Sequence, residues 1–337
     1  MPKPGEIGGS VACAPALSVI IPIFNEEAIL LELAERLTRC LWEMGVSYEI
    51  IFVDDGSTDR SGDILERLAA DSHIRAVQLS RNFGLTIAVT AGLDHASGEL
   101  IALMDGDLQD APEDLPTLVA KVREGYDVVY AIRTKRKESI IKRAVVFAFY
   151  RMLSRMTSTP LPVDSGLFSV MTRPVVNALK RLPERSRYLS GLRAWVGFTQ
   201  CGVPIERATR RVGAPRQTWR KLSRLAIDGM VSFSYVPLRL ATVAGIVTAI
   251  LSAAGGVWAV YMRLSSVNPP PGWASIVLIV LFIGSVQLLA LGVIGEYIGR
   301  VYDEVKGRPL YVVRARKGFA QQAEAAGWQV GTGCESR

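Results

Sequence analysis

Short apolar runs alternate with segments of helical periodicity through the first 131 residues of the chain. Continuous runs of β-branched and apolar residues predict strands that are buried on both faces. These runs lie at Leu17–Ile21, Ile50–Val53, Ala76–Leu79, Leu100–Met104 and Val128–Ala131. Because strands alternate with helices, the pattern predicts an α/β fold with a mostly parallel sheet covered by helices on both faces.

The helices between these strands are predicted from apolar spacing and from their starting residues. Asn25 is the predicted N-cap of the first helix, and Pro112 stands at the start of the last. The predicted helices are Glu26–Met44, Asp59–Ala70, Thr86–Ala96 and Pro112–Glu124. Ligands of such sheets bind at the carboxyl ends of the strands, so the loops that follow the strands are the first places to look for chemistry.

Two much longer apolar runs lie near the C-terminus. Ala241–Met262 is 22 residues without a charge, and Trp273–Gly295 is 23. Each run is long enough to cross about 30 Å of hydrocarbon as a helix. Only the ten residues Arg263–Gly272 separate them, so the pattern predicts a transmembrane hairpin rather than a buried helical pair.

Positive charge on the two sides of this hairpin predicts its orientation. Seven Lys or Arg residues and one acidic residue lie from Arg210 to Arg239, and seven more basic residues follow Gly295, whereas the linker contains only Arg263. The positive-inside rule therefore predicts that the α/β domain and both termini are cytoplasmic. The run Leu17–Ile23 is too short for a signal peptide. We expect an integral protein of a bacterial inner membrane or its equivalent.

Composition narrows the chemistry. The 337-residue chain is 49% hydrophobic and 21% charged, with a net charge of +7, which excludes disordered and low-complexity classes. Its 4 cysteines form no CxxC pair and it has only 2 histidines, so neither a disulfide framework nor a zinc site is predicted. Any bound metal should be a hard ion held by carboxylates.

Acidic motifs follow three of the predicted strands. They are Pro22-Ile-Phe-Asn-Glu-Glu27, Asp54-Asp-Gly-Ser-Thr-Asp59 and Asp105-Gly-Asp-Leu-Gln-Asp110. A lone Asp-x-Asp is usually a solvated turn, but here it is the third acidic motif at a strand end. The carboxylates of Asp105 and Asp107 therefore predict a Mg²⁺ or Mn²⁺ site that also binds a diphosphate.

These motifs resemble the signatures of glycosyltransferase family 2, which has the Rossmann-like GT-A fold. The similarity continues through RNFG, TAGLDHASGE, ERSRYLSGLRAWVGF, VPIERATRRVG and RKLSRLAIDGMVSFS, and then through the hairpin. This order is similar to the membrane-anchored polyprenyl-phosphate glycosyltransferases, the group of the dolichol-phosphate mannose synthases and bactoprenol glucosyltransferases. The resemblance implies that one sugar moves from a nucleotide-sugar to a polyprenyl phosphate, undecaprenyl or dolichyl, with inversion at the anomeric carbon.

The resemblance also implies roles for individual residues. The nucleoside would be surrounded by Pro22, Asn25, Glu26, Asp54 and Asp55, with Asp105 contributing to nucleotide binding. Metal binding falls to Asp105 and Asp107, and Gln109 would lie beside the metal and the sugar. Asp164 aligns with an aspartate proposed as the base, although a turn or helix-capping role is the alternative. Leu85 and Gly166–Val170 depart from the family pattern, which leaves the sugar open; a UDP-sugar is favoured over GDP-mannose.

Basic residues near the hairpin predict where a lipid phosphate would bind. The candidates are Arg207, Arg210, Arg211 and Arg216. Two amphipathic stretches, at about 140–156 and at 216–235, predict helices in the membrane interface, with packing inside the soluble core as the alternative. The basic residues flank a membrane hairpin and form no nucleic-acid-reading motif, so nucleic acid is not an expected partner.

The predicted organisation has five segments. They are an N-terminal tail at 1–16, a GT-A domain at 17–215, a juxtamembrane helix at 216–235, the two-helix transmembrane hairpin at 236–299 and a cytoplasmic C-terminal segment at 300–337. Gly292, Gly295 and Gly299 offer small residues for self-association, so we expect a homo-oligomer in the bilayer.

Two other functions fit parts of this pattern. A processive polysaccharide synthase would have a Gln-x-x-Arg-Trp motif and more membrane spans, whereas Gln217-Thr-Trp-Arg has a different order. An inactive membrane scaffold or sensor that binds a nucleotide-sugar is the alternative outside the enzymes. None of the acidic motif residues is missing, which favours the enzyme.

Overall fold

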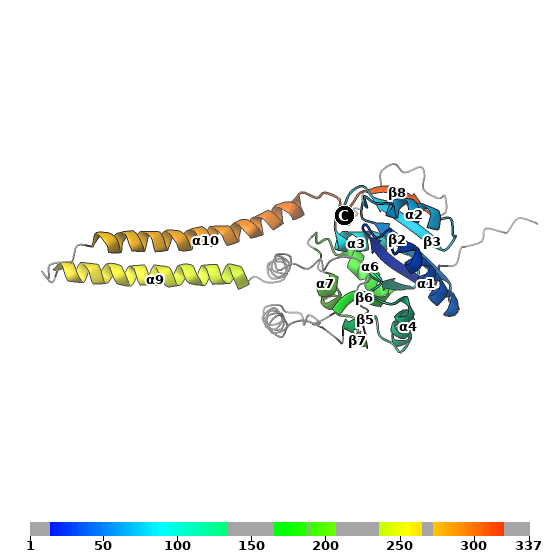
Figure 1. The fold of residues 1–337 in the computed structure, drawn as a ribbon. Coiled ribbons are helices and arrows are strands. Elements are labelled where there is room, and N and C mark those ends of the chain that lie inside the picture. The colour runs from blue at the N-terminus through cyan, green and yellow to red at the C-terminus, as the bar shows by residue number, and fades with distance from the viewer. Residues whose placement is uncertain are drawn as a thin grey trace, which may run out of the picture. The chain divides into compact units, whose positions relative to one another are not determined.

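The computed structural model describes residues 14–133, 165–185, 187, 189–206, 236–264 and 272–319. These residues belong to two compact units. One unit is an α/β domain and the other contains two long helices (Figure 1). The predicted helices at 140–156 and 216–235 lie outside the described residues.

The α/β unit is built on one sheet of eight strands, in the order β7-β5-β6-β4-β1-β2-β3-β8. The strands are β1 (Leu17–Ile23), β2 (Tyr48–Asp54), β3 (Ile74–Leu79), β4 (Leu100–Leu103), β5 (Val128–Arg133), β6 (Ser165–Thr172), β7 (Gln200–Ile205) and β8 (Val313–Lys317). Strands β4, β1, β2 and β3 form a parallel core, and β5 and β7 are also parallel. β6 runs antiparallel to both β4 and β5, and β8 runs antiparallel to β3. The predicted mostly parallel α/β sheet is confirmed.

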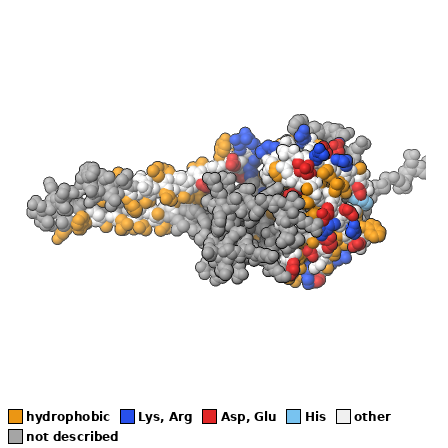
Figure 2. Space-filling view, in the orientation of Figure 1, with side chains coloured by type: hydrophobic (Ala, Val, Ile, Leu, Met, Phe, Trp, Pro, Cys, Tyr) orange, Lys and Arg blue, Asp and Glu red, His pale blue; other side chains and the backbone are white. Residues whose placement is uncertain are grey.

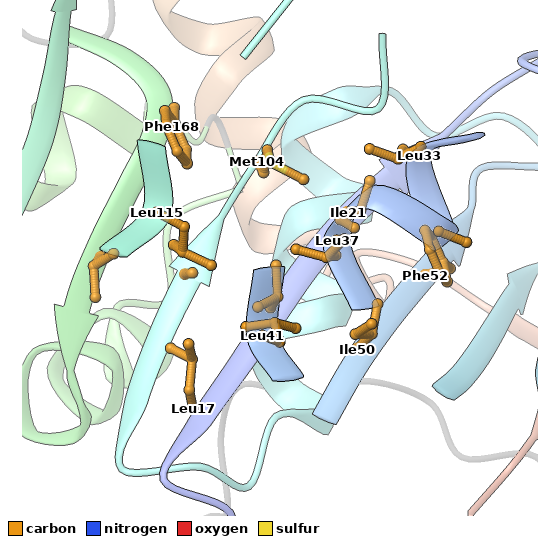
Figure 3. Close-up of a cluster of buried hydrophobic side chains, with 14 of the residues drawn as sticks. Leu17, Ile21, Leu33, Leu37, Leu41, Ile50, Phe52, Met104, Leu115 and Phe168 are labelled. Atoms are coloured by element: carbon orange, nitrogen blue, oxygen red, sulfur yellow. The ribbon is translucent and has the colours of Figure 1, made fainter. Parts of the chain in front are cut away.

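Helices cover both faces of this sheet. They are α1 (Leu30–Glu43), α2 (Ser61–Leu68), α3 (Leu85–His95), the 3₁₀ turn η1 (Pro112–Asp114), α4 (Leu115–Arg123), α6 (Arg173–Arg181) and α7 (Leu189–Trp195). On one face, Ile21 and Phe52 of the sheet pack against Leu33 and Leu37 of α1 (Figure 3). On the other face, α3 lies so close that a side chain on Gly92 would overlap Ile20. Because both faces are covered, every residue of β1 is buried.

The first helix begins later than the sequence predicts. α1 begins at Leu30, and its N-cap position is Ile29 rather than Asn25. Asn25 instead has a φ of 54° and belongs to the loop after β1. The prediction of Asn25 as N-cap is therefore wrong, because its side chain contacts the neighbouring loop, as described below.

The second unit contains α9 (Val236–Leu264) and α10 (Trp273–Val305), which pack side by side (Figure 1). Both helices are long and apolar enough to cross a membrane, with windows at Ala241–Trp258 and Phe282–Val305 that are 0% buried. Hydrophobic side chains are exposed along the surfaces of both helices (Figure 2). They include Ile250, Trp258 and Leu288. α10 continues beyond residue 299, where the sequence predicts the end of the hairpin.

The chain returns to the α/β unit after α10. β8 pairs with β3 and forms the edge of the sheet, and the Ser80 amide donates to the Val312 carbonyl at 2.9 Å. The Tyr311 hydroxyl donates to Asp94 of α3 at 2.8 Å, and Lys317 forms a 2.7 Å ion pair with Glu66 of α2. The segment that follows the two long helices is thus part of the same sheet as the segments that precede them.

Candidate active site

Three loops meet at the carboxyl edge of the parallel core. Strand β1 pairs with β2 on one side and with β4 on the other, and all three run in the same direction. The registers place Ile23 opposite Asp54 and Ile20 opposite Leu103. The acidic motifs that follow these strands are therefore neighbours in space, as expected for a ligand site on a parallel sheet.

The loops after β1 and β2 are joined through Asn25. Its side-chain Oδ1 accepts a hydrogen bond from the Thr58 amide at 2.8 Å, and its own amide donates to the Ser57 hydroxyl at 3.1 Å. Asparagine adopts the left-handed conformation found here more readily than most residues, since its short polar side chain bonds locally. Asn25 therefore acts as a clasp between two loops of the candidate site.

Glu27 and Asp59 add a second, reciprocal connection between the same loops. The Glu27 amide donates to Asp59 Oδ2 at 3.2 Å, and Glu27 Oε2 accepts from the Arg60 amide at 2.9 Å. The Glu26 amide donates to the Ser61 hydroxyl at 3.1 Å. These bonds satisfy backbone groups that precede helices α1 and α2, and they fix the distance between the two loops.

The paired aspartates at the end of β2 are almost fully buried, and both accept hydrogen bonds from backbone amides. Asp54 is 1% exposed, and it accepts from the Ser57 amide at 2.8 Å and from Gln78 Nε2 at 3.2 Å. Asp55 is 3% exposed and accepts from the amides of Phe83 and Gly84 at 2.7 and 2.9 Å. Burial raises the pKa of the Asp55 carboxyl above its ordinary value, although these two amides act in the opposite direction.

Burial alternates along the loop that follows β4. Gly106, Leu108, Asp110 and Pro112 are buried. The residues that alternate with them, Asp105, Asp107 and Gln109, are partly exposed. A side chain on Gly106 would approach the Pro22 carbonyl to 2.9 Å, so only glycine lets this loop lie against β1. Every second residue of the loop is thus packed into the domain, and the residues that alternate with these leave two carboxylates and an amide partly exposed to solvent.

The partly exposed residues of this loop are of a type that binds hard divalent cations. Among the described residues, no group of three or more His, Cys, Asp or Glu side chains could hold a metal ion. Two carboxylates and an amide oxygen are hard donors that suit Mg²⁺ or Mn²⁺, which readily takes its remaining ligands from water and phosphate. The residues therefore fit a divalent cation that binds together with a phosphate-bearing ligand.

The structure brings some of the predicted site residues together and says nothing of others. Asn25, Glu26, Asp55, Asp105, Asp107 and Gln109 all lie in the three loops, Asp54 ends β2, and Pro22 is buried in β1 beside them. Asp164, Arg207, Arg210, Arg211 and Arg216 lie outside the described residues. The predicted metal and nucleotide residues therefore meet at one edge of the sheet, and the predicted acceptor site stays a prediction.

Sequence reasoning missed several residues that shape this site. Glu27, Ser57, Thr58 and Asp59 connect the first two loops, and Phe83 and Gly84 supply the amides that bind Asp55. The signal for the first group was present, since an unbroken polar run directly after a buried strand predicts side-chain bonds to nearby backbone. The Phe83–Gly84 contact depends on tertiary packing, which no local pattern reveals.

Comparisons with known proteins identify the family of the chain. The family model for glycosyl transferase family 2 matches residues 18–179. The uncharacterized glycosyltransferase YkcC of Bacillus subtilis is 43% identical over 307 residues, which cover 90% of this chain and 94% of the relative. A prophage-derived bactoprenol glucosyl transferase of Shigella flexneri is 37% identical over 300 residues, covering 88% of this chain and 97% of that protein.

A solved structure was also similar. The mannosyltransferase PcManGT from Pyrobaculum calidifontis, in complex with GDP-Man and Mn²⁺, covers 88% of this chain and 90% of its own, with 17% identity and a TM-score of 0.44.

Proposed function

Because this chain belongs to glycosyltransferase family 2, we propose that it transfers one sugar from a nucleotide-sugar to a polyprenyl phosphate. The product would be a polyprenyl-phosphate-linked monosaccharide, formed with inversion at the anomeric carbon. The similarity to a bactoprenol glucosyl transferase extends over 88% of this chain, including the two long helices, and therefore supports a lipid-linked acceptor. A UDP-sugar is the favoured donor.

The donor would bind across the three loops at the carboxyl edge of the sheet. We assign Pro22, Asn25, Glu26, Asp54 and Asp55 to the nucleoside side of this site. Asn25, Asp54 and Asp55 have carboxylate or amide oxygens engaged with backbone amides, so they would shape the pocket by fixing the loops around it. Asp105 and Asp107 would hold Mg²⁺ or Mn²⁺, with Gln109 beside the sugar.

Charge must be stabilised on the nucleoside diphosphate as it leaves. A divalent cation, when bound, supplies this stabilisation as a Lewis acid. The protein's part is to hold Asp105 and Asp107 close to the diphosphate from a loop attached to the core. Their partial exposure leaves room for phosphate oxygens to complete the site.

The acceptor phosphate needs little chemical activation. A phosphomonoester has a second pKa of about 6, so its oxygen is largely deprotonated at neutral pH. Cations that hold it in place matter more than a strong base. We assign this task to Arg207, Arg210, Arg211 and Arg216, with Asp164 near the acceptor as the base.

The path of the chain supports a two-span arrangement at the cytoplasmic face. β7 precedes the long helices and β8 follows them, and both strands belong to one sheet. A chain that leaves a folded domain and returns to it must cross a bilayer an even number of times. Helices α9 and α10 supply two spans, and the positive-inside rule places their flanks in the cytoplasm.

The observation that carries this proposal is the meeting of three acidic loops on adjacent parallel strands, in a chain whose family transfers sugars. The test is an assay of detergent-solubilised protein with undecaprenyl phosphate, UDP- and GDP-sugars and Mg²⁺ or Mn²⁺. We expect product from one donor, and none from Asp107→Ala. Asp63→Ala, which removes an exposed carboxylate of α2, is the matched control and should stay active.

Two results would separate the alternatives. Product from GDP-mannose alone would replace the UDP-sugar with a mannosyl donor. Metal-dependent binding of a nucleotide-sugar without turnover of any donor in the panel would contradict the transferase proposal and favour the sensor.

A further inference from the structure

Leu108 has an unusual backbone conformation for its residue type. Its φ is 55°, and among the described residues Asn25 is the only other non-glycine residue with a positive φ. The left-handed region is unfavourable for a side chain such as leucine, which has no polar group to bond locally. Both exceptions lie in the loops of the candidate active site, where backbone strain often accompanies function.

Burial of the side chain explains why Leu108 keeps this conformation. The residue is 5% exposed and belongs to the hydrophobic core that also contains Met104, Leu115 and Phe168. Removing the leucine side chain from water favours the buried position and opposes the backbone strain. The core therefore holds the loop in a conformation that the local backbone would not choose.

The residues on either side of Leu108 are the ones assigned to the metal and the sugar. Asp107 Oδ1 accepts a hydrogen bond from the Gln109 amide at 3.1 Å, which closes a tight turn around Leu108. Asp107 and Gln109 are partly exposed, whereas Leu108 between them is buried. The burial of Leu108 thus sets the direction in which the Asp107 and Gln109 side chains point.

We propose that Leu108 is a positioning residue, whose burial in the core holds Asp107 and Gln109 in the geometry that binds the divalent cation and the donor. This inference rests on the proposed function of the loop. Leu108 itself touches neither ligand. Truncation of any buried leucine lowers the stability of the fold, but truncation of Leu108 should also weaken metal binding. The freed loop must then be ordered again each time the metal binds.

The experiment compares Leu108→Ala with Leu118→Ala in the full-length protein in detergent. Leu118 lies on α4, is 0% exposed and belongs to the same core, but it is not part of the loop. Mn²⁺ binding in the presence of UDP is measured by electron paramagnetic resonance, together with Tm. We expect both variants to lower Tm. Leu108→Ala alone should raise the Kd for Mn²⁺, by about tenfold.

Two further variants make the test independent of folding yield. Leu108→Met retains a long apolar side chain and should bind Mn²⁺ within about threefold of the wild type. Leu108→Gly removes the anchor and also the unfavourable side-chain contact with the backbone, so it adopts this φ without strain. It should fold, and it should bind Mn²⁺ more weakly than the wild type does.

The outcomes separate this inference from the proposed function. Equal Mn²⁺ affinities for Leu108→Ala and Leu118→Ala would overturn the positioning role, as would wild-type affinity in Leu108→Gly. A wild-type protein that binds no Mn²⁺ with UDP would contradict the proposed metal site itself, and the positioning role with it.

Discussion

Asp55 and Gly84 lie 29 positions apart in the sequence and are joined by a hydrogen bond of 2.9 Å from the Gly84 amide to Asp55 Oδ2. The other carboxylate oxygen accepts from the Phe83 amide at 2.7 Å. Gly84 is the N-cap of α3, so one buried carboxylate fixes the start of that helix. The second acidic motif is thereby connected to the RNFG segment.

This arrangement predicts a pH dependence of donor binding. Burial raises the pKa of Asp55, so its carboxyl takes up a proton at a higher pH than an ordinary aspartate. The added proton occupies one carboxyl oxygen, which then no longer accepts from the Phe83 or Gly84 amide. The local geometry beside the donor site should therefore change, even though protonation favours the fold as a whole. We expect the Kd of a UDP-sugar, measured by calorimetry, to rise as the pH falls through this raised pKa.

The stability contribution of Asp55 has the opposite sign from that of a salt-bridged aspartate. Because its pKa is higher in the folded protein than in the unfolded chain, protonation favours the fold. Its contribution to the free energy of unfolding therefore rises as the pH falls from the folded pKa to the unfolded one. Asp55→Asn should bind the donor weakly and lack this pH step. An unchanged step in that variant would assign it to another group.

Asn25 allows a test of the clasp between the first two loops. Asn25→Asp retains the oxygen that accepts from the Thr58 amide, whereas Asn25→Gly loses it but keeps the left-handed φ without strain. Asn25→Ala loses the bond and also adds strain. A lost hydrogen bond of about 1 kcal/mol corresponds to roughly a fivefold change in an equilibrium constant.

The KM for the nucleotide-sugar should therefore increase in the order wild type, Asn25→Asp, Asn25→Gly, Asn25→Ala. The measurement is steady-state kinetics with the donor varied at saturating acceptor. If Asn25→Asp were as impaired as Asn25→Ala, the amide group itself would be needed for donor binding and the clasp would not be its main role.

The sequence predicted the parallel core of the sheet because its signal is local. β1 to β5 are apolar runs, and each is found within a few residues of its predicted bounds. β8 has the sequence VRARK, with charged residues at three of five positions, and it pairs at the sheet edge with a strand more than 200 positions earlier. Such a strand is defined by its partner rather than by its own composition.

The candidate site, too, could be predicted from the sequence only in part. The positions of the acidic motifs follow from the ends of the strands, so the sequence could place them at one edge. The direction of each side chain could not be predicted, because it depends on contacts between loops. Asn25 has the pattern of an N-cap, yet it bonds to Thr58 of the next loop, and Leu108 is left-handed although its residue type does not favour that conformation.

The Tyr311 hydroxyl contributes to the stability with which the segment after α10 packs on the α/β unit. The residue is 4% exposed, and its hydroxyl donates to Asp94, which also lies 3.6 Å from Lys180. Burial and the Asp94 charge raise the pKa of this hydroxyl, so it stays a donor throughout the working range of pH. A hydrogen bond to a charged acceptor contributes about 1.5–3 kcal/mol.

Tyr311→Phe should therefore lower the Tm of the full-length protein in detergent. Tyr126→Phe is the control, because Tyr126 is 37% exposed. We also expect the chain truncated after Arg308 to be less stable than either variant, since loss of β8 leaves the β3 edge unpaired. Equal Tm values for Tyr311→Phe and the wild type would mean that the Tyr311 hydroxyl adds nothing to the attachment.

The topology of the long helices gives the last prediction. Gly272 is the N-cap of α10, and Lys306 is its C-cap. If α10 spans the membrane once and β8 lies in the cytoplasmic domain, these two residues must face opposite sides. Cysteine variants Gly272→Cys and Lys306→Cys report the sides through a membrane-impermeant maleimide, in a background where the 4 native cysteines are replaced by serine.

In intact cells whose outer barrier admits the reagent, we expect Gly272→Cys to react and Lys306→Cys to react only after the membrane is permeabilised. The reverse pattern would place the sheet on the outer side, where the nucleotide-sugars of the cytoplasm are not available. Labelling of both residues without permeabilisation would mean that α10 does not span. Since β7 and β8 share one sheet, the side of the membrane on which Lys306 is found is also the side on which α9 begins.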